Sequence, residues 1–270
     1  VDNNSSDGTP EFLALIDSET RRSLNLKIIP QKFNGGLSQA TDVAIGESSG
    51  EWLLSCNPDI VFTDDFRKML EYAKANSFPI LAPQLITTEG TPQYCMRQFT
   101  LTRLFFCLTR LGRLLSRFLA RDYFGRDLHY GYRLFDHPVL VEHPIASFFL
   151  IKRSALLQLG HLFSRDLPVY FGDTDLFSRA SLRGMRMVLV PTLRIRHQRG
   201  YSRTVLHPEV HHFMFVQSMI RYAYKWHLFP RILTALVFVD AVIAPLTQGL
   251  SPTKVNMMSA AFRLKGALRA

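Results

Sequence analysis

The sequence predicts an α/β protein with a mainly parallel central sheet, followed by C-terminal helices. Two observations predict this class. Short apolar runs that end at turn-forming residues, as strands do, alternate with helical stretches over most of the chain. From about residue 206 the chain becomes apolar and helical, with scattered Arg and Lys. We therefore expect an α/β domain over residues 1–205 and a helical region over residues 206–270.

The individual elements follow from local signals. In the first hundred residues we expect strands at 26–29, 51–56 and 79–82 and helices at 36–46 and 63–75, the second with Thr63 as its N-cap. Further along we expect strands at 145–152 and 187–190 and helices at 154–159 and 173–183. Gly160 and Gly184 close these two helices, and Pro191 ends the last strand. In a parallel α/β sheet, ligands bind beyond the carboxyl ends of the strands.

The charge of the chain indicates an anionic partner. The 270 residues carry a net charge of +10, which favours nucleic acid, an acidic membrane surface or phosphorylated substrates. In residues 101–121, five arginines share one face of a helical wheel and most Leu and Phe lie opposite. This pattern is typical of a helix in a membrane interface, and equally of a surface helix with a solvated arginine face.

The apolar stretch at 232–247 does not predict a membrane span, because Asp240 and Pro245 interrupt it. We interpret it as an interfacial or packed helix. The three cysteines form no paired framework, which favours a reducing compartment. Together these features predict a cytoplasmic protein, peripheral on the inner face of the cell membrane.

One candidate site follows the strand at 51–56, where Asn57-Pro58-Asp59 forms a turn. The proline stiffens the turn and leaves the carboxylate of Asp59 at the edge of the sheet. A hard divalent cation needs oxygen ligands, and a site built around diphosphate oxygens uses only one or two protein carboxylates. The same residues also fit an Asx turn before a helix, so the local sequence leaves both interpretations open.

A second candidate site is the start of the helix at 173–183, which carries Asp173 and Asp175 after an aromatic lead-in. Acidic residues in a first turn can simply complement the helix dipole. An apolar surrounding also raises the pKa of a carboxyl group, which suits a general base. Asp173 is the predicted base, and Asp175 is either a residue that orients the turn or a rival for that role.

Two polar segments complete the candidates. Residues 194–203 contain four arginines and a histidine, which suit a pyrophosphate clamp. Nucleic-acid binding competes with this interpretation, but no stacking aromatic series accompanies the basic residues. Residues 1–9, rich in Asp, Asn and Ser, form either a polar turn or a strand end that contacts a base and ribose.

The order and spacing of these motifs resemble the family 2 glycosyltransferases, most closely the rhamnosyltransferase-like branch. The resemblance is carried by residues 1–9, Asn34-Gly35-Gly36, residues 50–59 with Asn-Pro-Asp, and residues 146–153, 170–183 and 196–202. It implies a Rossmann-like glycosyltransferase A fold, a nucleotide-sugar donor, and Mg²⁺ or Mn²⁺. The implied activity is inverting transfer of a sugar, with rhamnose as one candidate, to a hydroxyl of a saccharide or lipid-linked acceptor in cell-surface polysaccharide synthesis.

The resemblance also implies residue roles. Asp173 corresponds to the catalytic base. Asp59 corresponds to the metal–diphosphate aspartate, and His197 to the late histidine at the same metal. The remaining positions expected to bind the nucleotide or its diphosphate are Asp2, Asn34, Arg199 and Arg203.

The chain departs from the family pattern in three places. Gly172 stands where the family usually has Glu, and Asp42 stands where Asn is common. The first strand and helix of the family are missing before Val1, so we expect an incomplete nucleotide pocket. Two competing hypotheses remain: a non-catalytic, membrane-associated sugar-nucleotide-binding relative, and a nucleic-acid-binding protein. We favour the transferase and expect no nucleic-acid partner.

Overall fold

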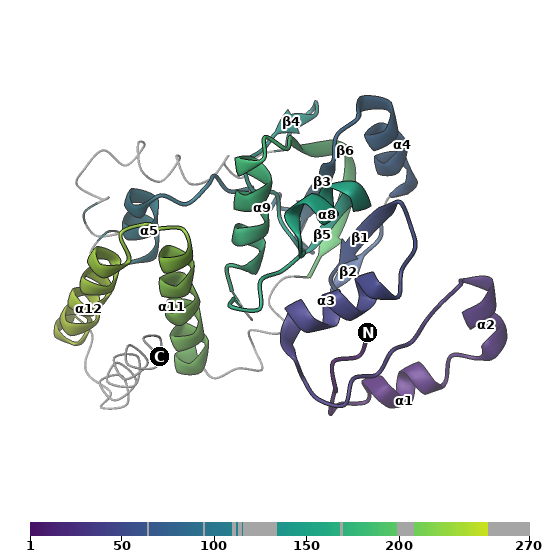
Figure 1. Ribbon diagram of the computed structural model, residues 1–270, viewed down its shortest axis with the longest axis horizontal. Coiled ribbons are helices and arrows are strands. Elements are labelled where there is room, and N and C mark those ends of the chain that lie inside the picture. Colours follow the sequence, from purple (N-terminus) through teal and green to yellow (C-terminus); the bar gives the residue numbers. More distant parts are fainter. Residues whose placement is uncertain are drawn as a thin grey trace.

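The computed structural model describes residues 1–63, 65–93, 95–109, 112, 115, 134–167, 170–198 and 208–247. Helices surround a six-stranded mixed sheet in this part of the chain (Figure 1). The strands are β1 (Trp52–Cys56), β2 (Ile60–Val61), β3 (Ile80–Ile86), β4 (Val139–Leu140), β5 (Phe148–Lys152) and β6 (Met187–His197). The helices are α1 (Thr9–Ala14), α2 (Ser18–Ser23), α3 (Gly36–Gly46), α4 (Arg67–Asn76), α5 (Leu101–Leu108), α8 (Arg153–Leu159), α9 (Gly172–Leu182), α11 (Pro208–Lys225) and α12 (Pro230–Thr247).

The sheet confirms the α/β class but not the expected strand directions. The strand order is β1-β5-β3-β6-β2, with β4 paired to β6. Of the five pairings among the described strands, only β3–β6 is parallel. The expectation of a mainly parallel sheet is therefore wrong. The prediction was based on the alternation of strands and helices. Strand β5 is buried along most of its length, as central parallel strands are, but it runs antiparallel to both of its neighbours.

Strand β6 continues well past Pro191, where the sequence predicted that it would stop. Its pairing with β3 shifts register at this point: Pro83 pairs with Val190, and the next residue, Gln84, pairs with Arg194. A proline has no N–H to give to the ladder, and such an irregularity tolerates it. The extension beyond Pro191 carries His197 to the end of the sheet where β2 lies.

The helix bounds agree closely with the sequence predictions at α3, α8 and α9, and differ at α4. Helix α3 has the predicted bounds, and α8 and α9 each begin one residue earlier than predicted. Thr63 is not an N-cap, because α4 begins only at Arg67 and the Thr63 hydroxyl instead donates to the carbonyl oxygen of Arg194. The expected strand at 26–29 is also absent from the described chain: an isolated parallel bridge between Asp2 and Pro30 takes its place.

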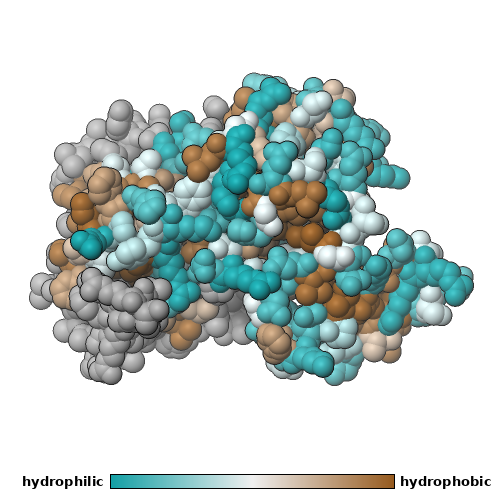
Figure 2. All heavy atoms as spheres, in the orientation of Figure 1, coloured by the Kyte–Doolittle hydropathy of each residue, from teal (hydrophilic) through white to brown (hydrophobic). Residues whose placement is uncertain are grey.

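Helices α1 and α2 contain no buried residue. Phe12 and Leu15 of this segment are largely exposed, as is Leu37 at the start of α3 to a lesser degree. Figure 2 shows apolar residues gathered on this side of the molecule, around α3 and beside α1. The apolar surface therefore lies next to the polar segment that begins at Asp2.

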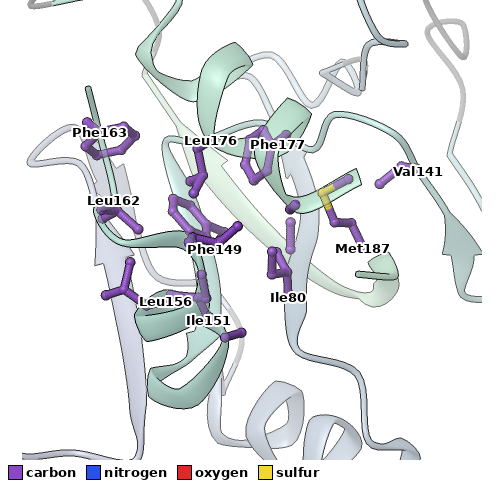
Figure 3. Close-up of a cluster of buried hydrophobic side chains, with 14 of the residues drawn as sticks. Ile80, Val141, Phe149, Ile151, Leu156, Leu162, Phe163, Leu176, Phe177 and Met187 are labelled. Atoms are coloured by element: carbon purple, nitrogen blue, oxygen red, sulfur yellow. The ribbon is translucent and has the colours of Figure 1, made fainter. Parts of the chain in front are cut away.

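Apolar side chains pack on both faces of the sheet. On one face, Phe149 and Ile151 of β5 and Ile80 of β3 pack against Leu176 and Phe177 of α9 (Figure 3). The opposite face holds a second cluster that includes Met69 and Ala73 of α4 and Phe148, Leu150 and Val188 of the sheet. Since successive residues of a strand face opposite sides, β5 contributes to both clusters. This packing fixes the position of α9, which carries Asp173.

The C-terminal helices pack against the entry to α9. Phe171, the residue before α9, shares a third apolar cluster with Leu104 of α5, Tyr222 of α11 and Leu233 of α12. In Figure 1, α5, α11 and α12 form a group beside α9. Among the described residues, no helix is both long enough and apolar enough to cross a membrane. Helix α5 makes up most of the described part of the stretch at 101–121, and the four arginines beyond Arg103 lie outside the described residues.

Candidate active site

Asp59 and His197 face each other at one end of the sheet. The turn Asn57-Pro58-Asp59 leads from β1 into β2, and Ile60 of β2 pairs with His197 of β6. The backbone N–H of Gln198 donates to the carbonyl oxygen of Asp59 at 3.0 Å. This pairing places Nε2 of His197 3.3 Å from Oδ2 of Asp59. The structure therefore brings together the two residues that were predicted as metal ligands.

The Asp59–His197 pair has the chemistry to hold a divalent cation. Oδ1 of Asp59 is buried and makes no hydrogen bond within the described part of the chain. A buried carboxylate oxygen without a partner is costly unless an electropositive group satisfies it. Carboxylate oxygen and imidazole nitrogen are both metal ligands. No group of three or more His, Cys, Asp or Glu side chains suited to a metal occurs among the described residues, so diphosphate or water oxygens would have to complete the coordination.

Asp173 lies at a cavity of about 620 Å³ between α3, β1, β5 and the start of α9. Asn57, two residues before Asp59, lines the same cavity, as do Trp52 and Ser147. The Asp173 side chain is half-buried, and its Oδ1 accepts a hydrogen bond from the Thr174 backbone N–H at 2.8 Å. Asp173 and the turn that carries Asp59 therefore lie at the same cavity.

The backbone directly before Asp173 adopts an unusual conformation. Phe171 has a φ of +63°, in the left-handed region that bulky side chains rarely occupy. Its ring is buried against the rings of Phe99 and Tyr222, which holds this conformation in place. Such strained residues cluster at functional sites. The aromatic lead-in that singled out Asp173 in the sequence is therefore a packed support for the start of α9.

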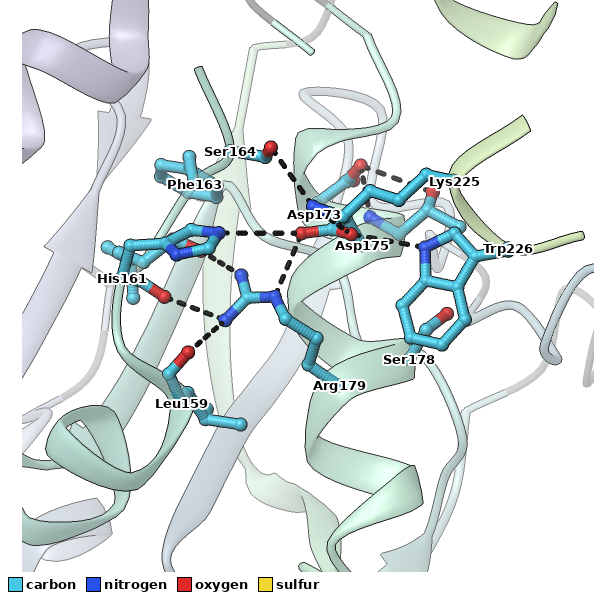
Figure 4. A network of polar contacts seen from close by, with 12 residues as sticks. Leu159, His161, Phe163, Ser164, Asp173, Asp175, Ser178, Arg179, Lys225 and Trp226 are labelled. Atoms are coloured by element: carbon cyan, nitrogen blue, oxygen red, sulfur yellow. Dashed lines mark hydrogen bonds and ion pairs between the residues drawn. The ribbon is translucent and has the colours of Figure 1, made fainter. Parts of the chain in front are cut away.

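Asp175, the rival candidate for the base, is fully buried and held by charged partners (Figure 4). Its Oδ2 accepts from Nε of Arg179 at 2.9 Å, and its Oδ1 lies 2.9 Å from Nζ of Lys225 and accepts from Nε1 of Trp226 at 3.1 Å. Burial alone would raise the pKa of Asp175, but Lys225 and Arg179 outweigh it and hold the pKa below its usual value. A buried carboxylate with these partners is poorly suited to accept a proton from a substrate.

His143 lies behind Asp173 and is completely buried. Its Nδ1 is 3.0 Å from the carbonyl oxygen of Pro144, and its Nε2 is 3.1 Å from the Thr174 hydroxyl. Because a carbonyl oxygen only accepts, Nδ1 carries the proton and Nε2 accepts from Thr174. Burial lowers the pKa of His143, and the nearby charge of Asp173 opposes this shift without overcoming it. A neutral histidine thus supports the residue next to Asp173.

The polar segment at the start of the chain is joined to the turn before α3. Asn3 Nδ2 donates to Asn34 Oδ1 at 2.8 Å, and the Gly35 backbone N–H donates to Asn3 Oδ1 at 3.2 Å. Asp2 is almost buried and accepts from the Ser5 hydroxyl at 2.5 Å. The hydrogen bonds of Asn3 therefore join the segment of Asp2 to the turn that contains Asn34, and these are two of the four residues predicted to bind the nucleotide or its diphosphate.

The predicted arginine clamp is described only in part. Arg194 and Arg196 are exposed on β6, on the side of the strand opposite to buried His197. Arg199 and Arg203 lie outside the described residues.

The sequence carried no signal for several polar residues around the site, of which Gln93 and His143 are buried. Gln93 and His143 contact residues of the two motifs, and Lys225 at the end of α11 and Trp226 just after it contact Asp175. None of them stands in a recognisable motif. They lie between 31 and 104 positions from their partners in the sequence, and only folding brings them there.

The fold and the site define an α/β protein with a carboxylate–imidazole pair at a sheet end and a second carboxylate at a neighbouring cavity. The model of the family described as Glycosyl transferase family 2 matches residues 1–159. The chain therefore belongs to glycosyl transferase family 2. This membership and the mixed sheet agree with the glycosyltransferase A fold that the motifs imply. Asp2, Asn34 and Asp59 lie within the matched residues, and Asp173 and His197 lie beyond them.

Solved structures similar to the chain are distant in sequence. The mannosyltransferase PcManGT from Pyrobaculum calidifontis, in complex with GDP-Man and Mn²⁺, has 15% identity and a TM-score of 0.49, with 99% of this chain and 69% of that chain covered. GalNAc-T7 with UDP, GalNAc and Mn²⁺ has 14% identity and a TM-score of 0.49, with 72% and 35% covered. TarS 1–349 from S. aureus in complex with UDP has 14% identity and a TM-score of 0.46, with 97% and 60% covered.

The chain thus spans little more than a third of GalNAc-T7 and three fifths of the TarS fragment. No curated protein matches the chain significantly in sequence.

Proposed function

We propose that the chain is an inverting glycosyltransferase that moves a sugar from a nucleotide-sugar donor to a hydroxyl of a saccharide or lipid-linked acceptor. One observation carries the proposal. Asp173 is half-buried at the 620 Å³ cavity, whereas Asp175 is fully buried and bound by Arg179 and Lys225. This difference leaves Asp173 as the carboxylate of the pair that can accept a proton.

The reaction follows from this role. The Asp173 carboxylate accepts the proton of the acceptor hydroxyl, and the oxygen forms a bond to the anomeric carbon of the donor. The bond from that carbon to the diphosphate oxygen breaks on the opposite side, and the nucleoside diphosphate leaves with the electron pair. Attack opposite the leaving group inverts the configuration at the anomeric carbon. General-base assistance of this kind contributes about 10²–10⁴-fold to a rate.

Asp59 and His197 are the proposed ligands of Mg²⁺ or Mn²⁺ in this reaction. The cation would supply positive charge to the departing diphosphate. Support for this assignment comes from Oδ1 of Asp59, which is buried and has no hydrogen-bond partner among the described residues, and from the 3.3 Å separation of the two side chains. Asp2 and Asn34 are proposed at the nucleotide, and Arg199 and Arg203 at the diphosphate.

We also propose that the acceptor is presented at an anionic membrane surface on the cytoplasmic side, as in the synthesis of cell-surface polysaccharides. Exposed Phe229 and Ile232, with Arg231 between them, support this proposal, because apolar side chains flanked by a cation suit a membrane interface. Rhamnose is the first donor sugar to test.

The test compares Asp173→Asn with the wild-type chain and with Asp166→Asn, an exposed aspartate nearby. Transfer is measured over a panel of nucleotide sugars that includes dTDP-rhamnose, UDP-sugars and GDP-sugars. We expect Asp173→Asn to lower transfer by about 10²–10⁴-fold while donor affinity is retained, and Asp166→Asn to behave as wild type. Near-normal turnover in Asp173→Asn would overturn the assignment. Donor binding without any transfer or hydrolysis by wild type would favour the non-catalytic relative.

A further inference from the structure

Gln93 holds His197 by two hydrogen bonds. Its Nε2 donates to the backbone carbonyl oxygen of His197 at 3.1 Å, and its Oε1 lies 2.9 Å from Nδ1 of the imidazole. The Gln93 side chain is 2% exposed, so neither contact is shared with bulk solvent. One planar amide therefore fixes both the main chain and the ring of His197.

These contacts determine which ring nitrogen of His197 carries the proton. The amide orientation of Gln93 is set by its first contact, because only the NH₂ group can donate to a carbonyl oxygen. Oε1 must then face Nδ1, and since an amide oxygen only accepts, Nδ1 carries a hydrogen. In the neutral imidazole, Nε2 is left with a lone pair, and it is Nε2 that points at Oδ2 of Asp59.

In the neutral form of His197, Nε2 and the carboxylate of Asp59 are two electron-pair donors whose nearest atoms lie 3.3 Å apart. The other carboxylate oxygen, Oδ1, is buried without a hydrogen bond in the described chain. A cation bound beside these atoms would accept electron pairs from Nε2 of His197 and from the carboxylate of Asp59. Histidines that bind metals commonly donate their other N–H to a fixed acceptor, which sets the tautomer and the ring orientation.

We propose that Gln93 is a positioning residue that presents Nε2 of His197 to a divalent cation shared with Asp59. The inference rests on the proposed metal–diphosphate site and adds a residue that supports it without touching the cation or the substrate.

A second buried glutamine supports Gln93 in turn. Nε2 of Gln84 donates to the backbone carbonyl oxygen of Gln93 at 3.1 Å, and the Gln93 backbone N–H donates to the carbonyl oxygen of Leu85 at 2.8 Å. Gln84 sits where the register between β3 and β6 shifts. A chain of hydrogen bonds therefore leads from Gln84, at the register shift between β3 and β6, through Gln93 to His197.

The experiment measures Mn²⁺ affinity by the loss of the free-ion EPR signal, with the ion alone and with UDP or GDP added. The variants are Gln93→Leu, Gln93→Glu and Asp59→Asn. The matched control is Gln98→Leu, which removes a glutamine that hydrogen-bonds Glu142 and Ser178, away from His197. Nitrogen-15 NMR of the histidines, with His197 assigned by substitution, reports the tautomer directly.

We expect Gln93→Leu to weaken Mn²⁺ binding by about 10–100-fold, the usual effect of losing the partner of a ligating histidine. Gln93→Glu keeps an acceptor at Nδ1 and should bind Mn²⁺ more tightly than Gln93→Leu, and Gln98→Leu should match wild type. Wild type should show the Nδ1–H tautomer at His197, and Gln93→Leu should lose that preference.

Wild-type Mn²⁺ affinity in Gln93→Leu, together with a clear loss in Asp59→Asn, would overturn this inference and leave the metal site standing. Equal losses in Gln93→Leu and Gln93→Glu would also overturn it, because only damage to packing would then be at work. Mn²⁺ binding that is undetectable in wild type, or unchanged in Asp59→Asn, would overturn the metal site and this inference together.

Discussion

Nζ of Lys225 lies 2.9 Å from Oδ1 of Asp175, and this ion pair joins the last turn of α11 to the first turn of α9. Asp175 also accepts a hydrogen bond from Trp226, the residue after α11. The C-terminal helices therefore contact the helix that carries Asp173 through the ion pair of Lys225 with buried Asp175 as well as through the apolar cluster around Phe171. We therefore expect substitutions of Asp175 to lower the stability of the fold rather than to affect the chemical step directly.

Asp175→Asn should destabilise the protein by about 3–5 kcal/mol, because it leaves Arg179 buried without its counter-ion. Urea denaturation followed by circular dichroism measures the loss. The control is Asp65→Asn, which breaks the exposed pair with Arg67 and should change stability little. If Asp175→Asn were as stable as wild type and lost only transfer activity, Asp175 would compete with Asp173 for the role of base.

Stability should fall in mild acid because of His143. Burial lowers the pKa of this residue from its ordinary value of 6.5. The unfolded chain therefore takes up a proton near pH 6.5, and the folded protein takes it up only at lower pH. Between these two pKa values the free energy of unfolding should decrease with falling pH, by up to about 1.4 kcal/mol per pH unit.

The variant His143→Gln should reduce this slope, because glutamine has no proton to take up in that range. Urea titrations at a series of pH values measure the slope, and the exposed His137→Gln serves as the control. An unchanged slope in His143→Gln would show that another group causes the acid sensitivity.

Two cysteines should react very differently with iodoacetamide. Cys95 is buried, and burial raises the pKa of its thiol to about 12, so it should stay unmodified in the folded protein. Cys56 is exposed at the surface. Partial desolvation of its sulfur and, to a smaller extent, the negative charge of Asp59 raise the pKa of its thiol. Asp59→Asn should therefore speed the alkylation of Cys56 severalfold at pH 8.

Mass spectrometry of the peptides that contain Cys56 and Cys95 measures both rates. Asp65→Asn, which does not contribute to the pKa of Cys56, is the control. A rate at Cys56 that is indifferent to Asp59 would contradict the arrangement of the turn after β1.

The turn between α11 and α12, together with the first turn of α12, should bind anionic vesicles. Phe229 is 63% exposed and Ile232 is 50% exposed, and burying either side chain in lipid contributes about 1.5–3 kcal/mol. Phe229→Ser combined with Ile232→Ser should therefore weaken binding to phosphatidylglycerol vesicles by at least about tenfold, measured by flotation. The matched control replaces Leu157 and Leu182, two leucines on α8 and α9 that are even more exposed, by serine. Equal binding by both double variants would count against this surface as the membrane contact.

The sequence by itself determined the local elements and the family. Helix α3 has its predicted bounds, and Gly160 and Gly184 end their helices with φ values of +84° and +67°, because glycine adopts this conformation at little cost. The motif order also identified family membership, since it depends on spacing along the chain. Helix ends and motif spacing depend on residues that are close together along the chain, so the sequence alone is enough to predict them.

Only the tertiary structure decided how the strands pair and which polar residues meet. An apolar strand can be buried equally well between parallel or antiparallel neighbours. The apolar pattern of β5 therefore did not predict its direction. Pro191 could stay within β6 because β3 shifts register there. Asp173 and Asp175 look alike in the sequence. They differ because Lys225 and Trp226 reach Asp175 from about 50 residues further along the chain, and such long-range contacts form only when the core brings the helices together.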